Sequence, residues 1–105
     1  AYALKHLDRK KAEAEYRKEL EINPRYDNAH FNLGILYYRT GRKQDAVSLW
    51  EKALELNPDY NEARYNLLVH FYTAMDYDKA RYFAREYLGK GGKLPAELLK
   101  EIRFR

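Results

Sequence analysis

Cysteine is absent from the 105-residue sequence, so the fold relies neither on disulfide bonds nor on a thiolate metal site. Glycine and proline are scarce, at five and three residues, which excludes collagen-like and low-complexity architectures. No apolar run approaches the roughly 20 residues that a membrane-spanning helix needs. Residues 1–11 contain no apolar signal-peptide core. We therefore expect no membrane span and a cytoplasmic location.

The residues that are present indicate a folded, mostly helical chain. Hydrophobic residues make up 46% of the sequence and charged residues 34%, and tyrosine provides eleven of the aromatic side chains. Disordered chains lack such aromatic content. The net charge of +4 is small and spread along the chain, whereas a nucleic-acid-binding domain gathers its positive charge into a patch.

A repeat with a period of 34 residues organises the chain. The quartet Asn-Pro-Arg-Tyr at 23–26 returns as Asn-Pro-Asp-Tyr at 57–60. Further residues at the same step are Ala12, Ala46 and Ala80, then Leu20, Leu54 and Leu88, and the pairs Asn32 with Asn66 and Leu33 with Leu67. This register holds without insertion over two and a half units, so the repeat defines the architecture.

Apolar residues recur at helical spacing within each unit, at positions i, i+3, i+4 and i+7. Gly41 suits a left-handed helix C-terminus, and Pro58 ends the helix before it. The predicted helices are at about 1–6, 9–22, 28–40, 43–56, 62–74, 77–89 and 95–103. The sequence thus predicts an all-α superhelix, a solenoid of helix–turn–helix repeats.

This unit resembles the tetratricopeptide repeat. In the middle unit the resemblance rests on Leu33, Gly34, Tyr37, Ala46, Trp50, Ala53 and Pro58, with Gly41 in the turn and His30 at the leading aromatic position. The first unit keeps Ala12, Tyr16, Leu20 and Pro24, and the third keeps Leu67, Phe71, Ala80 and Leu88. In the third unit Leu68 replaces the glycine and Ala84 the aromatic residue, which we interpret as an exchange of sizes within one packing site.

The predicted organisation is a set of repeats over 1–94 followed by a cap. It comprises a partial repeat at 1–26, full repeats at 27–60 and 61–94, and a C-terminal capping helix and tail at 95–105. The last unit of a solenoid needs an end piece that covers its apolar face, and the stripe of Leu94, Leu98 and Ile102 suits that role. Ala1 falls within a helix, so we expect the first unit to be truncated.

A second apolar stripe on the first helix of each unit predicts a binding surface. In the family that the chain resembles, the matching positions line the concave face that holds ligands. The predicted groove consists of Phe31, Ile35, Tyr38, Arg39, Tyr65, Val69 and Tyr72, and its polar rim of Lys5, Asn28, Asn32 and Asn66. Tyrosine and arginine recur at the energetic centres of protein interfaces. The expected function is a protein–protein interaction scaffold that binds a peptide or an amphipathic helix of a partner.

Two other functions stay open at this point: a helical-repeat RNA binder, and a self-association module that uses the truncated first repeat. An enzyme is not expected, because the sequence offers no nucleophile with a paired base and no phosphate-binding loop. The histidines, His6, His30 and His70, lack the spacing of a metal site. We therefore expect no cofactor and no metal.

Overall fold

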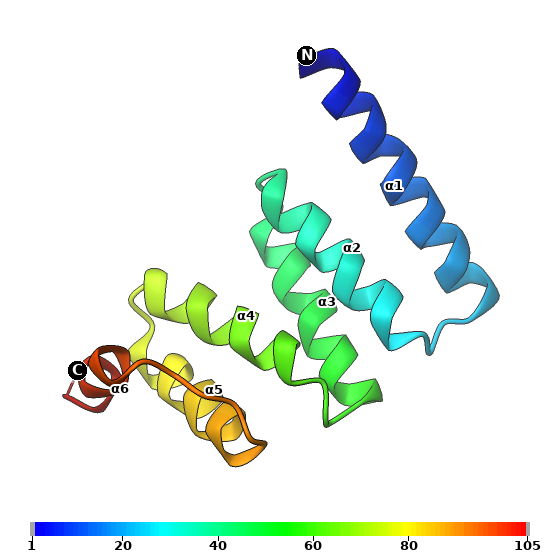
Figure 1. The fold of residues 1–105 in the computed structure, drawn as a ribbon. Helices are drawn as coiled ribbons and strands as arrows, with labels where there is room; N and C mark the ends of the chain where they lie inside the picture. The colour runs from blue at the N-terminus through cyan, green and yellow to red at the C-terminus, as the bar shows by residue number, and fades with distance from the viewer. Residues whose placement is uncertain (1, 105) are drawn as a thin grey trace. The chain divides into compact units, whose positions relative to one another are not determined.

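The structure, a computed structural model, describes the backbone of residues 2–104 and the side chains of residues 7–103. Within this range the chain is all-α and contains no strand (Figure 1). Its helices are α1 (Tyr2–Ile22), α2 (Asp27–Arg39), α3 (Lys43–Leu56), α4 (Asn61–Thr73), α5 (Tyr77–Gly89) and α6 (Ala96–Phe104). The five predicted helices after residue 27 are confirmed to within one residue at each end.

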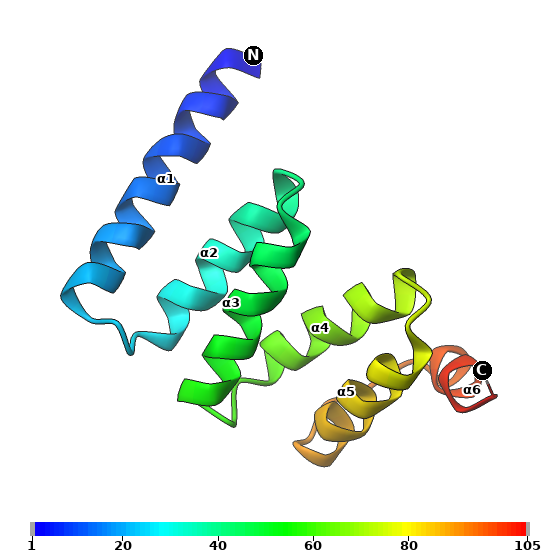
Figure 2. The same ribbon diagram turned by 180° about the vertical axis from the view of Figure 1, so that it is seen from behind.

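The chain consists of two compact units, Ala1–Asn57 and Pro58–Arg105. In the first unit α2 and α3 form an antiparallel hairpin, and α1 packs along α2 (Figures 1 and 2). In the second unit α4 and α5 form the hairpin and α6 packs on α5. The segment 90–95 runs back along α5, so that α6 lies near the beginning of α5 (Figures 1 and 2).

The prediction of two helices at 1–6 and 9–22 is wrong, because α1 runs without a break from Tyr2 to Ile22. The position that matches Gly41 in the repeat register is Leu7, which lies inside α1. Leucine is a good helix former, so a helix can continue through this position. The first repeat has no helical hairpin, and one long helix takes its place.

The helical hairpins turn through a shared hydrogen-bond pattern. After α2 the Arg42 N–H donates to the Tyr37 carbonyl at 2.8 Å, and the Gly41 N–H donates to the Tyr38 carbonyl at 3.3 Å. After α4, Asp76 and Met75 make the equivalent bonds at 2.9 and 3.1 Å. Both are Schellman motifs, which require a left-handed residue after the helix. Gly41 supplies it with φ of 89°, and Met75 supplies it with φ of 62°.

Met75 is therefore strained, since a left-handed conformation costs a non-glycine residue about 1–2 kcal/mol. Its side chain is exposed and contributes little packing. Replacing Met75 with glycine should relieve this strain. Glycine also makes the unfolded chain more flexible, which offsets part of the gain, so the free energy of unfolding should rise by about 0.5–1 kcal/mol. Urea denaturation of Met75→Gly measures the change in stability. Ala74→Gly is the control, because Ala74 has a φ of −82° and needs no glycine. The control should lose stability, and a loss in both variants would contradict the strain argument.

The core of the first unit lies between α2 and α3, where the backbones approach closely. An added Cβ on Gly34 would come within 2.6 Å of the Trp50 indole nitrogen, so only glycine fits there. The Trp50 Nε1–H donates to the Phe31 carbonyl at 3.3 Å. In the second unit Leu68 and Ala84 occupy the matching positions, and both are buried. The repeat register thus pairs a large residue with a small one in each hairpin, with the order reversed.

Candidate functional site

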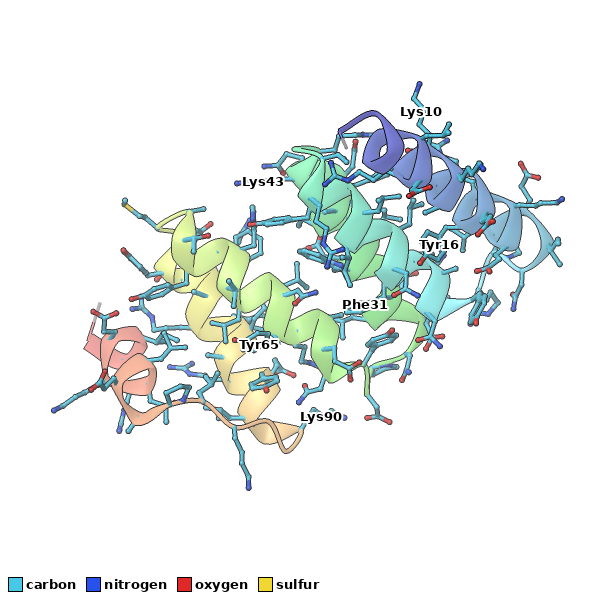
Figure 3. The ribbon with its side chains drawn as sticks, turned by 45° about the horizontal axis from the view of Figure 1, so that its top comes forward. Lys10, Tyr16, Phe31, Lys43, Tyr65 and Lys90 are labelled. Atoms are coloured by element: carbon cyan, nitrogen blue, oxygen red, sulfur yellow. The ribbon has the colours of Figure 1, made fainter. Side chains whose placement is uncertain are left out.

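A groove opens between α1 and α2 in the first unit, with a volume of about 330 Å³. We call it the α1–α2 groove, and its walls are Ala12, Tyr16, Asn32, Ile35, Leu36 and Arg39. The four α2 residues stand at i, i+3, i+4 and i+7, so that they form one helix face. Tyr16 lies in the space between the two helices (Figure 3). The floor is therefore apolar and the edges carry an amide and a guanidinium group.

The α1 wall has a counterpart in the α2–α3 hairpin. Ala12 and Tyr16 match Ala46 and Trp50 in the repeat register. Ala46 and Trp50 are buried beneath α2, at 0% and 3% exposure. Ala12 and Tyr16 are only half-buried, because the residues that precede them continue α1 instead of folding back as a covering helix. The groove is thus a helix-packing site without its helix within the described residues.

Polar contacts hold α1 against the hairpin at one end of the groove. The Glu13 carboxylate pairs with Arg42 at 3.1 Å and with Arg17 at 3.5 Å. Arg17 also donates to the Tyr37 hydroxyl at 2.5 Å. The Arg42 guanidinium carbon lies 3.8 Å from the centre of the Tyr37 ring. We call this set of four residues, Glu13, Arg17, Tyr37 and Arg42, the α1 latch.

The latch involves charges that face solvent. The pKa of Arg42 is raised, chiefly by its hydrogen bond to Asp45 and further by Coulombic interactions with Tyr37, Asp45 and Glu13. The hydrogen bond from Arg42 Nε to Asp45 Oδ2 is 3.0 Å long. The guanidinium is thus fixed at the junction of α1, α2 and α3, where its planar face covers the ring of Tyr37.

The predicted groove residues of the first unit divide into two sets. Ile35, Arg39 and the rim residue Asn32 come together in the α1–α2 groove. Phe31 is 9% exposed and belongs to the core. Tyr38 is half-buried, with its ring 5.3 Å from that of Trp50 and the Lys43 ammonium 5.3 Å from its centre. A ligand contact through these two aromatic residues stays a prediction.

Rim residues outside the groove have other surroundings. Asn28 is exposed, and its backbone N–H donates to the Asp27 carboxylate at 2.8 Å. The side chain of Lys5 lies outside the described residues. Its backbone belongs to α1 rather than to a separate first helix. The expectation that it stands on the first helix of a hairpin is therefore wrong.

The predicted residues of the second unit lie on α4 (Figure 3 labels Tyr65). Tyr65 and Val69 are 42% and 38% exposed and share one helix face at i and i+4. The Tyr65 ring packs 5.5 Å from that of Tyr87, and Asn66 beside it is half-buried. Together Tyr65 and Val69 form an exposed apolar face, which we call the α4 face.

Tyr72, unlike the residues of the α4 face, already has a side-chain partner on another helix of the chain. Its hydroxyl donates a hydrogen bond to the Glu101 carboxylate of α6. Its ring meets that of Tyr77 edge to face, with the centroids 5.7 Å apart. Tyr72 therefore connects α4 to α6 in this structure, and a ligand would have to replace that bond.

Reasoning from the sequence missed Ala12, Tyr16 and Leu36 as groove residues. It assigned Ala12 and Tyr16 to the packing of a partial repeat. The signal that identifies them is the repeat register, since both match buried residues that another helix covers. That inference requires α1 to be continuous, and the predicted break between 6 and 9 concealed it.

Neither a metal-binding cluster nor a membrane-spanning helix is found among the described residues. Among the side chains that are placed, no three histidine or acidic groups lie close enough to hold a metal ion. His30 Nε2 lies 2.9 Å from the Pro24 carbonyl, a local contact at the helix start. Within the described part of the chain, no helix has the length and hydropathy to cross a bilayer.

Comparison with known proteins agrees with the repeat. The sequence profile of the tetratricopeptide repeat matches residues 27–64. A search of curated proteins found no match. Among solved structures, the crystal structure of MamA, a tetratricopeptide-repeat protein, matches with a TM-score of 0.75 at 18% identity. The match covers 92% of this chain and 53% of MamA, so the chain spans about half of that protein.

These matches confirm the predicted fold. Tetratricopeptide repeats form a non-catalytic scaffold fold that generally mediates protein–protein interaction. The matched segment includes all of α2 and α3, together with the Gly34–Trp50 contact. Residues 27–64 match the profile of the tetratricopeptide repeat, and the chain has the all-α helical-repeat fold seen in tetratricopeptide-repeat proteins.

Proposed function

We propose that the chain is a protein-interaction module whose α1–α2 groove holds a helical segment of a partner protein. The observation that carries this proposal is the half-open wall of Ala12 and Tyr16. The same two register positions, Ala46 and Trp50, bury a helix in the following hairpin. A groove that repeats a helix-packing site is complementary to a helix.

The chemistry of the groove specifies the kind of helix. In the α2–α3 hairpin the covering helix brings Gly34 against the Trp50 ring. Tyr16 takes the place of Trp50 in α1, so a small residue of the partner fits over it. Arg39 is exposed at the α2 edge and can pair with a carboxylate. The proposed ligand is an amphipathic helix with a small residue in its apolar face and an acidic residue at its edge.

The α4 face is a second candidate contact surface. Tyr65 presents a large ring at low entropic cost, and Val69 extends its apolar area. We propose that this face contributes to partner binding independently of the α1–α2 groove. Tyr72 is a weaker candidate, because its hydroxyl is bonded to Glu101.

Catalysis and nucleic-acid binding are not part of the proposal. Several basic side chains that would face phosphates are paired with carboxylates, as in the pairs Arg42–Asp45 and Arg81–Asp78 at 3.0 and 2.6 Å. Such pairing opposes the dense phosphate contact that RNA binding needs. We propose a binding function without a chemical step, in keeping with the scaffold role of the fold.

Replacing Ile35 with aspartate tests the groove. The new carboxylate would stand in the apolar part of the groove, where the apolar face of a bound helix would have to desolvate it, and desolvating a charge costs more than the roughly 2–7 kcal/mol of an unpaired neutral polar group. Capture of partner proteins from the native host, quantified by mass spectrometry, should fall more than about tenfold. Ser48→Asp adds the same charge to the exposed side of α3 and should leave capture unchanged. Undiminished capture by a folded Ile35→Asp variant would exclude the groove.

The identity of the captured segment completes the test. A photo-crosslinking residue at Arg39, which is exposed at the groove edge, should label a helical segment of the partner. A second copy of the chain is the alternative occupant. Light scattering distinguishes it, because a dimer that forms with increasing concentration and is lost in Ile35→Asp would identify self-association. Labels outside any helical segment would contradict the proposed ligand class.

A further inference from the structure

A second pocket lies in the other unit, between α5 and α6, with a volume of about 390 Å³. We call it the C-terminal pocket, and its walls are Arg81, Ala84, Arg85, Leu88, Leu99, Ile102 and Arg103. The α5 wall uses positions 81, 84, 85 and 88, which form one helix face. This face is separate from the α4 face, because it lies on a different helix and looks toward α6.

The floor of the pocket is apolar and partly open. Ile102 of α6 is buried at 5% exposure against α5, whereas Leu88 is 37% exposed and Leu99 is half-buried. The nine residues of α6 are too few to cover the whole face of α5. An accessible aliphatic surface is left between the two helices, large enough for one or two side chains, since ligand pockets begin at about 300 Å³.

The rim of the pocket is basic, and its positive charges outnumber the carboxylates that pair with them. Three arginines line it, and no carboxylate does. Asp78 pairs with Arg81 at 2.6 Å. Among the described side chains, neither Arg85 nor Arg103 forms an ion pair, and both are exposed. Guanidinium groups bind carboxylates in a bidentate manner, so this rim provides two anion-binding groups that form no ion pair with the described side chains, beside an aliphatic floor.

We infer that the C-terminal pocket binds a short acidic peptide whose carboxylates flank an aliphatic anchor. The anchor enters between Leu88 and Leu99, and the flanking carboxylates pair with Arg85 and Arg103. Charge complementarity determines the sign of the ligand, and the partly open apolar floor favours a ligand with an aliphatic side chain. This inference does not depend on the proposed function of the α1–α2 groove, which uses other helices.

The alternative source of negative charge and apolar surface is an anionic membrane. Membrane-binding helices turn their apolar face outward, into the headgroup layer. In α6 the apolar residues face inward, since Ile102 is buried and Leu98 and Leu99 are half-buried. Its exposed side carries charges of both signs, among them Glu97, Lys100 and Glu101. The peptide is therefore the better fit.

A peptide array tests the inference directly. The probes are six-residue peptides with two acidic residues on each side of an aliphatic pair. Matched sets replace the acids with amides or the aliphatic pair with serines. The chain should bind the acidic aliphatic set, and the best member, labelled with fluorescein, should give a fluorescence-anisotropy titration. Both replacements should weaken binding by about tenfold or more. Added salt should weaken it as well, since the rim charges are exposed.

Variants of the pocket complete the design. Arg85→Gln with Arg103→Gln should weaken binding of the labelled peptide by about tenfold or more, and Leu88→Gln should weaken it without changing helical content. Lys18→Gln with Lys93→Gln removes the same charge from two exposed positions that do not line the pocket and should leave binding intact.

Three results would contradict the inference. No binding by any acidic aliphatic peptide, or equal binding by the arginine variants, would overturn the inference. So would binding to anionic phospholipid vesicles that needs the same arginines while the peptides fail to bind. Ile35→Asp should not change peptide binding, which separates this pocket from the α1–α2 groove.

Discussion

Replacing Trp50 with alanine should lower the free energy of unfolding by about 3–5 kcal/mol. The indole is 3% exposed between α2 and α3. Its removal leaves a cavity that Gly34 cannot fill, and it deprives the Phe31 carbonyl of the indole N–H. A domain of this size has a total stability of about 5–15 kcal/mol, so a substantial share would be lost. Urea denaturation followed by far-ultraviolet circular dichroism measures the change.

Trp50→Phe is the matched control for this experiment. The phenyl ring keeps part of the apolar volume but lacks the N–H donor and the second ring, so its cost should be smaller than that of alanine. A loss below about 1 kcal/mol for Trp50→Ala would be typical of an exposed position. That result would refute the close packing of α2 on α3.

Replacing Leu68 with glycine should destabilise the second unit by about 3–6 kcal/mol. Leucine-to-alanine changes in a core cost about 2–5 kcal/mol, and a glycine inside a helix adds about 1 kcal/mol. Leu68 is 1% exposed and stands where the first hairpin has Gly34. Ala84, at 3% exposure, stands where that hairpin has Trp50. With glycine at 68 and alanine at 84, the variant would have two small residues where the native hairpin has one large and one small residue, and a cavity would be left in the core.

Adding Ala84→Trp to Leu68→Gly should recover much of this loss, because the pair then reproduces the Gly34–Trp50 combination. Ala84→Trp alone should be destabilising, since a well-packed core does not accept the extra volume. The double-mutant cycle should thus give a coupling energy of about 1–3 kcal/mol. Additive costs of the two changes would show that the residues do not share one packing site.

The sequence was sufficient to predict the helices from residue 27 onward because their ends carry local chemistry. Pro58 prevents the residue before it from continuing a helix, and Gly41 supplies the left-handed turn that it was predicted to form. The 34-residue register then places the same elements in the next unit. It even holds where the chemistry is unfavourable, since Met75 adopts the conformation of Gly41.

The first repeat could not be predicted in this way. Leu7 favours a continuing helix, but such a preference does not decide the outcome, because Met75 makes the turn without being glycine. The register alone suggested a break that the chain does not make. The error extended to the candidate site, because the open wall of Ala12 and Tyr16 depends on the continuity of α1. Contacts between distant residues were equally inaccessible, such as the bond from Tyr72 to Glu101, which depends on where α6 packs.

The α1 latch has a consequence for the behaviour of the first helix. Arg17, Glu13 and Arg42 are 56, 30 and 46% exposed at their side chains, so dissolved ions compete with their mutual attraction. The contacts that hold α2 on α3 are mostly apolar and feel no such competition. We therefore expect added salt to weaken the packing of α1 on the hairpin, while α2 and α3 stay packed on each other.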